Sequence, residues 1–211
     1  MRIAIRANDQ QKKEFAEKKI DSTEVVWLDE HSQNINDVDA YFDLLFDECN
    51  LSKNIFVKDV IVFANAVVTP ATELPPNYIR INAWNGFFSR TLAEVAASNE
   101  TTKEKASVIL SKMGWNFTWA QDEPGMIAAR IIATIINEAY FALQENVSTK
   151  DEIDIAMKLG TNYPYGPFEW SRKISLRNIF ALLKKLNEKE SRYAIAPLLM
   201  EECENIANVE M

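Results

Sequence analysis

Glycine and histidine are scarce in this chain of 211 residues. Its five glycines all lie at or after Gly86, so the residues before that point carry no glycine-rich loop of the kind that cradles phosphate groups. The only histidine is His31. A single histidine argues against a Ser-His-Asp triad and against a His-rich metal site. His31 follows Asp29 and Glu30 at the end of an expected strand, and we interpret it as a surface turn residue.

Cysteines, net positive charge and long apolar runs are also lacking. Cys49 and Cys203 are the only cysteines, which gives no disulfide framework and suits a reducing compartment. The formal net charge of −8 argues against a nucleic-acid or anionic-membrane binder, because both favour clustered Lys and Arg. The most apolar stretch, residues 126–143, is interrupted by Arg130 and Glu138, and we interpret it as a buried helix. Because the N-terminus also lacks the apolar region of a signal peptide, we expect a cytoplasmic protein with no nucleic-acid and no membrane partner.

The first part of the chain alternates short strand patterns with helical ones. Expected strands lie at residues 2–6, 24–28, 38–46, 59–64, 78–82 and 115–119, and expected helices at residues 9–19, 88–97 and 101–112. Alternation of this kind predicts a mostly parallel sheet. After Gly125 almost every segment has a helical pattern. We therefore expect a domain boundary at this point, with an α/β domain at residues 1–122 and an all-α domain at residues 123–211.

The helical part begins with a long apolar helix and a well-marked cap. The helix expected from Gly125 to Leu143 is apolar on nearly all sides, so we expect it at the centre of a helical bundle. Ser148 or Thr149 is expected to cap the next helix, and Thr149 and Glu152 have the spacing of a capping box.

Three motifs occur in order along the chain. Residues 82–95 begin Asn-Ala-Trp-Asn-Gly, residues 122–127 read Asp-Glu-Pro-Gly-Met-Ile, and residues 163–169 read Tyr-Pro-Tyr-Gly-Pro-Phe-Glu. In the same order, they resemble the His-Phe-Phe-Asn-Pro segment, the domain-joining Asp-x-Pro-Gly-Phe-Ile segment and the His-Pro-Met-Gly-Pro-Leu-Glu segment of the 3-hydroxyacyl-CoA dehydrogenases. This resemblance implies a shortened Rossmann-like domain followed by a helical dimerisation domain. It also implies a family reaction, the NAD-dependent oxidation of a 3-hydroxyacyl-CoA to a 3-ketoacyl-CoA.

The resemblance places four positions of this chain at the family's catalytic residues. Asn82 stands at the position of the catalytic His, and Glu94 stands at that of the Glu that orients it. Val67 and Ala129 match the family's Ser and Asn. An asparagine side chain has no proton that titrates near neutral pH and cannot act as a general base. We therefore take Asn82 and Glu94 as candidate remnants of a catalytic dyad.

The resemblance likewise marks the positions of a dinucleotide site. Residues 7–10, Ala-Asn-Asp-Gln, stand where the family has its glycine-rich phosphate loop, and Asp9 would put a carboxylate beside the pyrophosphate. Asp29 stands at the position that binds the adenosine ribose. Asp43 and Asn65 match further polar positions at strand ends. Asp29, Asp43 and Asn65 are thus the candidate cofactor-binding residues, yet with the fingerprint missing we expect no bound cofactor and no metal.

Three functional hypotheses remain open from the sequence. The chain is a 3-hydroxyacyl-CoA dehydrogenase relative whose activity is lost or much reduced, a non-catalytic protein that binds an acyl-CoA or another small ligand, or a structural dimeric partner. In each case the resemblance implies a homodimer formed through the helical C-terminal domain.

Overall fold

The computed structural model describes residues 1–18, 20, 22–28, 35–46 and 58–209, the last three of these without their side chains. The chain forms two compact units, Met1–Met126 and Ile127–Met211. The first unit holds the expected α/β structure and the second the expected helices. Asp29 and His31, for which the sequence suggested a ribose contact and a turn, lie outside the described residues.

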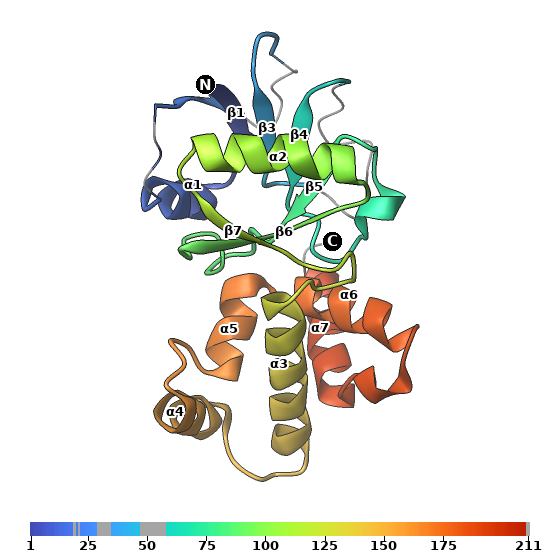
Figure 1. The fold of residues 1–211 in the computed structure, drawn as a ribbon. Helices are drawn as coiled ribbons and strands as arrows, with labels where there is room; N and C mark the ends of the chain where they lie inside the picture. Colours follow the sequence, from blue (N-terminus) through green and yellow to red (C-terminus); the bar gives the residue numbers. More distant parts are fainter. Residues whose placement is uncertain (19, 21, 29–34, 47–57, 210–211) are drawn as a thin grey trace. The chain divides into compact units, whose positions relative to one another are not determined.

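The described part of the N-terminal unit is built on a seven-stranded sheet with the order β2-β1-β3-β4-β5-β6-β7 (Figure 1). The strands are β1 (Arg2–Arg6), β2 (Glu24–Leu28), β3 (Ala40–Asp43), β4 (Ile61–Ala64), β5 (Tyr78–Ile81), β6 (Leu92–Ala97) and β7 (Asn116–Trp119). Neighbouring strands are parallel except β5 and β6. The predicted mostly parallel, Rossmann-like sheet is therefore confirmed. From β1 the strand order runs one way to β2 and the other way to β3, so the topological switch point lies between β1 and β3.

The larger buried cluster of this unit lies on one face of the sheet, and a second buried cluster, which includes Tyr41, Val62 and Tyr78, lies on the other face. Helix α1 (Asp9–Ala16) and helix α2 (Glu100–Lys112) cover the face of the larger cluster with apolar side chains, and α2 runs across the strands in Figure 1. The larger cluster includes Ile3, Ile5, Phe42, Phe63, Ile79 and Ile81 from the strands and Phe15, Ala106 and Leu110 from the helices. The strands β1, β3, β4 and β5 are short and mostly apolar because both of their faces are buried, and their charged residues are Arg2, Arg6, Asp43 and Arg80.

Residues 88–97 are the main correction to the predicted elements. We expected a helix there, but Leu92–Ala97 form strand β6. The segment Leu-Ala-Glu-Val-Ala-Ala is rich in helix formers, yet exposed Leu92 and buried Ala93 and Val95 follow the alternation of a strand. Pairing with β5 on one side and β7 on the other outweighs the helical propensity. The expected strand at residues 38–46 is shorter in the structure, as Ala40–Asp43.

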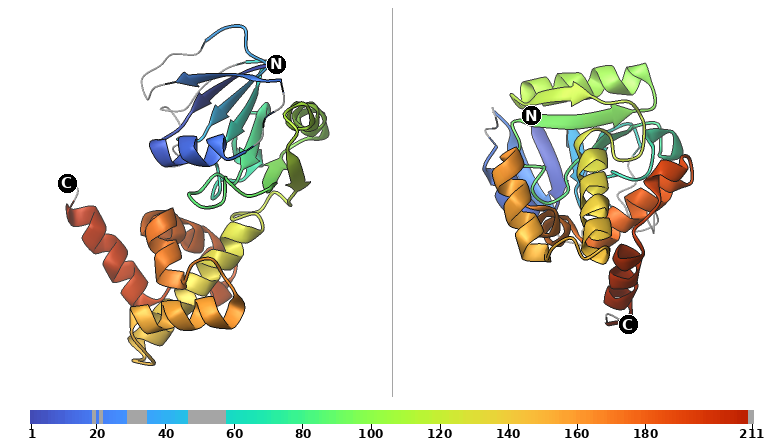
Figure 2. Two further views of the ribbon diagram at one scale, coloured as in Figure 1. Left: turned by 90° about the vertical axis from the view of Figure 1, so that its left-hand side faces the viewer. Right: turned by 90° about the horizontal axis from the view of Figure 1, so that it is seen from below.

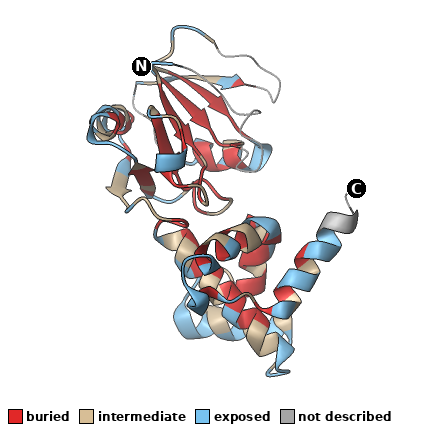
Figure 3. Cartoon of the chain, turned by 90° about the vertical axis from the view of Figure 1, so that its right-hand side faces the viewer, coloured by how far each residue is buried: buried red, intermediate tan, exposed pale blue. Residues whose placement is uncertain are grey.

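The described C-terminal unit is all-α, as expected. Its helices are α3 (Ala128–Gln144), α4 (Lys150–Thr161), α5 (Pro167–Ile174), α6 (Leu176–Asn187) and α7 (Pro197–Val209). Helix α3 contacts α5, α6 and α7, which gives it the central place that its apolar sequence predicts (Figure 3). Buried Asn137 in the middle of α3 accepts a hydrogen bond from the Ala196 amide and donates one to the Ala194 carbonyl, both at 2.9 Å. None of the helices in the described residues is long and apolar enough to span a membrane.

Helix α4 begins with the predicted capping box. Thr149 is the N-cap, and its hydroxyl accepts a hydrogen bond from the Glu152 amide at 3.3 Å. The Glu152 carboxylate in turn accepts hydrogen bonds from the hydroxyls of Ser148 at 2.6 Å and Thr149 at 2.8 Å, and from the Thr149 amide at 3.2 Å. These donors, the Ser148 hydroxyl first, lower the pKa of Glu152 to about 2. The ionised carboxylate is the form that this cap selects.

We predict that Glu152→Gln lowers the melting temperature at pH 7 and that the loss shrinks in acid. The folded-state pKa lies below the unfolded value, so the contribution of the carboxylate is present above the unfolded pKa of about 4.3. It is lost as the pH falls toward about 2. Melting curves followed by far-ultraviolet circular dichroism between pH 7 and pH 3 measure the difference. Glu138→Gln, at an exposed position on α3, is the control, and an equal loss for Glu152→Gln at pH 3 and pH 7 would contradict the prediction.

Candidate functional site

The carboxyl ends of β1 and β3, at the switch point, are joined by a buried ion pair. Arg6 and Asp43 are register partners on these strands. The Arg6 Nε donates to Asp43 Oδ1 at 2.8 Å, and its Nη2 donates to Asp43 Oδ2 at 2.7 Å. Asp43 is fully buried and Arg6 nearly so. Both carboxylate oxygens of the candidate cofactor residue Asp43 thus accept hydrogen bonds from Arg6 on the neighbouring strand. Its role toward a cofactor stays a prediction.

The loop after β1 is closed by its own side chains. Asn8 caps α1 by accepting the Gln11 amide at 2.8 Å, while the Gln11 side chain accepts the Asn8 amide at 3.0 Å. Buried Gln11 also donates from Nε2 to the carbonyl oxygens of Leu44 at 2.8 Å and Ala83 at 3.2 Å. The capping box uses amides that a pyrophosphate would need at a helix N-terminus. The exposed carboxylate of Asp9 stands in the first turn as well. These residues do not fit a dinucleotide pyrophosphate.

Asn65, the third candidate cofactor residue, ties two strand ends together. It follows β4, and its Nδ2 donates to the Leu44 carbonyl at 3.3 Å while its Oδ1 accepts the Ala83 amide at 2.9 Å. Leu44 follows β3, and Ala83 lies two residues beyond β5. The amide therefore holds the carboxyl ends of neighbouring strands in register, and a contact from Asn65 to a cofactor remains a prediction.

The two candidate dyad positions, Asn82 and Glu94, are brought together by the sheet. The Asn82 amide donates to the Glu94 carbonyl at 3.1 Å. This bond extends the antiparallel register of β5 and β6, in which Ile81 faces Val95. Residues directly opposite in an antiparallel pair project to the same face. The sheet therefore places the Asn82 and Glu94 side chains as neighbours.

The side-chain carboxamide of Asn82 is the polar group of this site that could bind a ligand. Asn82 is 4% exposed, and neither its Oδ1 nor its Nδ2 has a hydrogen-bond partner among the residues that the structure describes. A buried polar group without a partner costs about 1–3 kcal/mol. Such a carboxamide can donate to a carbonyl oxygen and accept from a hydroxyl, but it cannot remove a proton.

A fully buried arginine fixes the backbone around this position. Arg80 lies on β5, two residues before Asn82, and each of its hydrogen-bonding nitrogens finds an oxygen. Its Nε donates to the Ala66 carbonyl, its Nη2 to the Val67 carbonyl and its Nη1 to Asp122 Oδ1, each at 2.8 Å. Nη1 also donates to the Glu123 carbonyl at 3.1 Å. The sequence alone did not lead us to this cluster, although a charged residue inside an apolar strand was a signal for it.

Asp122 links the same cluster to a short 3-10 helix. Its carboxylate accepts the amides of Ala71 at 2.7 Å and Thr72 at 3.1 Å, besides the Arg80 guanidinium. The Gly125 amide donates to the Val67 carbonyl at 2.8 Å. The Asp-Glu-Pro-Gly motif is therefore anchored within the N-terminal unit by the loop that follows β4.

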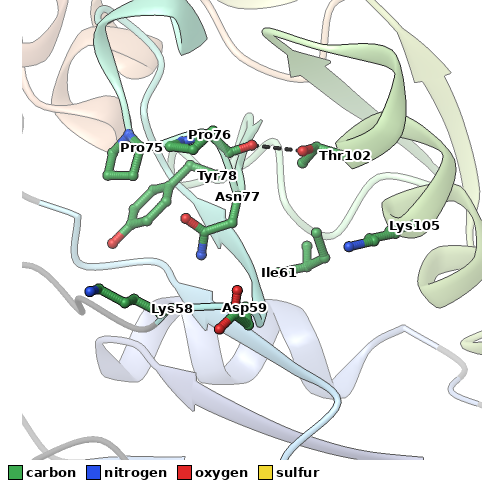
Figure 4. Close-up of a pocket in the computed structure, with 9 residues that line it drawn as sticks. All are labelled: Lys58, Asp59, Ile61, Pro75, Pro76, Asn77, Tyr78, Thr102 and Lys105. Carbon is green, nitrogen blue, oxygen red and sulfur yellow. Dashed lines mark hydrogen bonds between the residues drawn. The ribbon is translucent and has the colours of Figure 1, made fainter.

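A cavity of about 590 Å³ opens at the amino ends of β4 and β5 (Figure 4). Ile61 and Tyr78, which begin these strands, line it together with Asn77 and Thr102. The Thr102 hydroxyl is already used in a bond to the Pro76 carbonyl at 2.6 Å. The cavity is therefore at the opposite end of β5 from Asn82, and it is not part of the candidate site.

Comparisons with known proteins agree with these motifs. Residues 125–206 match the family model "3-hydroxyacyl-CoA dehydrogenase, C-terminal domain". The chain is 40% identical over 111 residues to 3-hydroxyadipyl-CoA dehydrogenase of Escherichia coli K12, covering 52% of this chain and 23% of that protein. It is 33% identical over 135 residues to 3-hydroxybutyryl-CoA dehydrogenase of Bradyrhizobium diazoefficiens, covering 62% of this chain and 46% of that protein. The chain thus spans less than half the length of either relative.

A solved structure shows the same fold over nearly the whole chain. It is the (S)-3-hydroxybutyryl-CoA dehydrogenase from Ralstonia eutropha, with a TM-score of 0.73 and 18% sequence identity, covering 95% of this chain and 92% of that one. At this identity the likeness concerns the fold alone. It supports the order of a Rossmann-like unit followed by a helical unit.

We predict that Arg80→Gln destabilises the N-terminal unit by about 3 kcal/mol, because it leaves buried carbonyls and the Asp122 carboxylate without their partner. Urea unfolding followed by tryptophan fluorescence measures this, since Trp170 is the only tryptophan outside the N-terminal unit. The control is Arg2→Gln, because Arg2 forms an exposed pair with Glu24 and should cost less than about 1 kcal/mol. Equal costs for the two variants would refute the role of Arg80.

Proposed function

The chain belongs to the 3-hydroxyacyl-CoA dehydrogenase family, and we propose that it has lost the NAD-dependent oxidation of 3-hydroxyacyl-CoA while keeping a site for a small acyl ligand. The observation that carries this proposal is the closure of the loop after β1. Asn8 and Gln11 satisfy each other there, and Gln11 reaches on to the carbonyls of Leu44 and Ala83. A pyrophosphate would have to displace this network and lie near the Asp9 carboxylate.

The family reaction needs two groups that this chain lacks. Oxidation of a 3-hydroxyl moves a hydride from carbon to the nicotinamide and moves the hydroxyl proton to a base. The closed loop leaves no place for the pyrophosphate that would carry the nicotinamide. Asn82 stands where the base is needed and accepts no proton near neutral pH. This chain therefore offers neither a site for the hydride acceptor nor a base for the hydroxyl proton.

Ligand binding requires less than catalysis, and Asn82 remains suited to it. Its buried carboxamide, free of partners within the described structure, matches a ligand that carries a carbonyl or hydroxyl oxygen. A 3-hydroxyacyl thioester carries both a carbonyl and a hydroxyl oxygen. This favours a non-catalytic acyl-binding protein over a slow dehydrogenase.

We predict that the full chain produces no NADH from 3-hydroxybutyryl-CoA and NAD above the rate without protein. Asn82→His should produce none either, because it supplies a base and no hydride acceptor site. Absorbance at the NADH band measures both. NADH formation by the unchanged chain would refute the proposed loss of activity.

Calorimetric titration with 3-hydroxybutyryl-CoA tests the retained site separately. Asn82→Leu should weaken binding up to about tenfold, which corresponds to one hydrogen bond of about 1.4 kcal/mol. If the unchanged chain did not bind 3-hydroxybutyryl-CoA, the acyl site would be rejected and a structural role would be favoured.

A structural role as a homodimer is the second candidate, and helix α7 favours it. In both views of Figure 2, α7 runs outward from the other helices of its unit. The helix has 13 residues and contacts α3 and α6. Met200 and Ile206 on α7 are nevertheless exposed apolar side chains, at 36% and 39%. We propose that α7 packs against a second copy of the chain, as the resemblance to a dimerisation domain implies.

We predict a particle of twice 24.1 kDa by light scattering at tens of micromolar. The double variant Met200→Glu and Ile206→Glu should be monomeric, because the charges would be buried in the interface. Val108→Glu is the control, since Val108 is an exposed apolar residue on α2 in the other unit. A monomeric unchanged chain, or a double variant that remains dimeric, would reject this interface.

A further inference from the structure

A second cavity in the N-terminal unit, of about 310 Å³, collects polar and cationic groups. It lies where the segment after α1 meets the segments that lead into β6 and β7. Lys18 and Arg90 are the two basic residues among the lining residues that the structure describes. Ser89 and Thr91 add hydroxyls, and Trp115 adds an aromatic wall. The cavity is separate from the Asn82 position and does not depend on the proposed loss of hydride transfer.

The amine of Lys18 is held over aromatic rings. Its Nζ lies 4.5 Å from the ring centroid of Trp115 and 5.7 Å from that of Phe88. It donates one hydrogen bond, of 2.7 Å, to the Arg90 carbonyl. No carboxylate in the described ranges forms an ion pair with Lys18, although Glu17 lines the same cavity. Burial lowers the pKa of Lys18 to about 8, so a useful fraction of the amine is unprotonated near neutral pH.

The groups around this amine suit a small anion. Arg90 lines the cavity with Lys18, and its guanidinium carbon lies 4.2 Å from the centroid of the Phe87 ring. A guanidinium binds carboxylates through paired hydrogen bonds. The hydroxyls of Ser89 and Thr91 are further donors. Among the lining residues that the structure describes, Glu17 is the one carboxylate, and Glu94 acts electrostatically on Arg90. A ligand with a carboxylate for Arg90 and an electrophilic carbon for Lys18 would match both cationic residues.

We propose that this cavity binds small oxo acids, which carry a carbonyl beside or near a carboxylate, and captures them as an imine on Lys18. The unprotonated Nζ adds to the carbonyl carbon and gives a carbinolamine. Loss of the hydroxyl with a proton, as water, gives the C=N bond. No electrons are exchanged with any other reactant, and hydrolysis reverses the step. The aromatic wall of Trp115 and Phe88 keeps the amine from full hydration.

Reductive trapping of the full chain tests the covalent step. The probe is glyoxylate, the smallest oxo acid with an aldehyde, with cyanoborohydride at pH 7.5 and peptide mass spectrometry as the readout. Lys18 should be modified at least about tenfold faster than Lys13, an exposed lysine of α1, because burial lowers the pKa of the Lys18 amine and Arg90 lines the same cavity. Equal rates at the two lysines would overturn the proposal.

The second arm tests the carboxylate. Arg90→Gln should slow the glyoxylate reaction at Lys18 by about tenfold, the effect of losing one charged hydrogen-bonded contact. It should leave the reaction with acetaldehyde, which has no carboxylate, unchanged. Unchanged tryptophan fluorescence and an unchanged urea midpoint confirm that the variant is folded. If Arg90→Gln slows both probes equally, or neither, the assignment to oxo acids is wrong.

Discussion

The buried guanidinium of Arg80 is the constraint on which the carboxyl end of the sheet depends. A charge with no exposure to water must be met by oxygens on every side. Arg80 finds them in the loop after β4 and in the segment after β7, at Ala66, Val67 and Asp122. These two segments are far apart in the sequence and are held together by one side chain. The end of β5, and with it Asn82, is therefore positioned by an ion pair as well as by the sheet.

The closed loop after β1 follows a related logic. A helix N-terminus presents unsatisfied amides, which either a ligand anion or the chain itself must satisfy. Here Asn8 and Gln11 satisfy them from within, and a cap of this kind contributes about 1 kcal/mol to folding without any ligand. Gln11 also uses its remaining amide hydrogens on Leu44 and Ala83. The chain thus stabilises by internal bonds the place where a Rossmann domain usually depends on glycines and a bound nucleotide.

Local patterns in the sequence predicted the elements well, and long-range polar contacts were the part they missed. The central strands are apolar runs, and Thr149 and Glu152 mark the start of α4, so both could be read from neighbouring residues. Strand β6 could not be predicted from neighbouring residues, because Leu-Ala-Glu-Val-Ala-Ala by itself favours a helix. Its pairing with β5 and β7 makes it a strand. The sequence placed Asn82 opposite Glu94 only through the family resemblance. The reach of Gln11 to Ala83, 72 residues away, has no local signal at all.

We propose that this chain keeps a Rossmann-like fold without a dinucleotide site. Calorimetric titration of the full chain with NADH tests it most directly, because it needs neither a substrate nor turnover. We expect a dissociation constant above about 1 mM, equivalent to less than about 4 kcal/mol of binding free energy. A micromolar dissociation constant would contradict it, since the network of Asn8 and Gln11 would then have to open for the pyrophosphate.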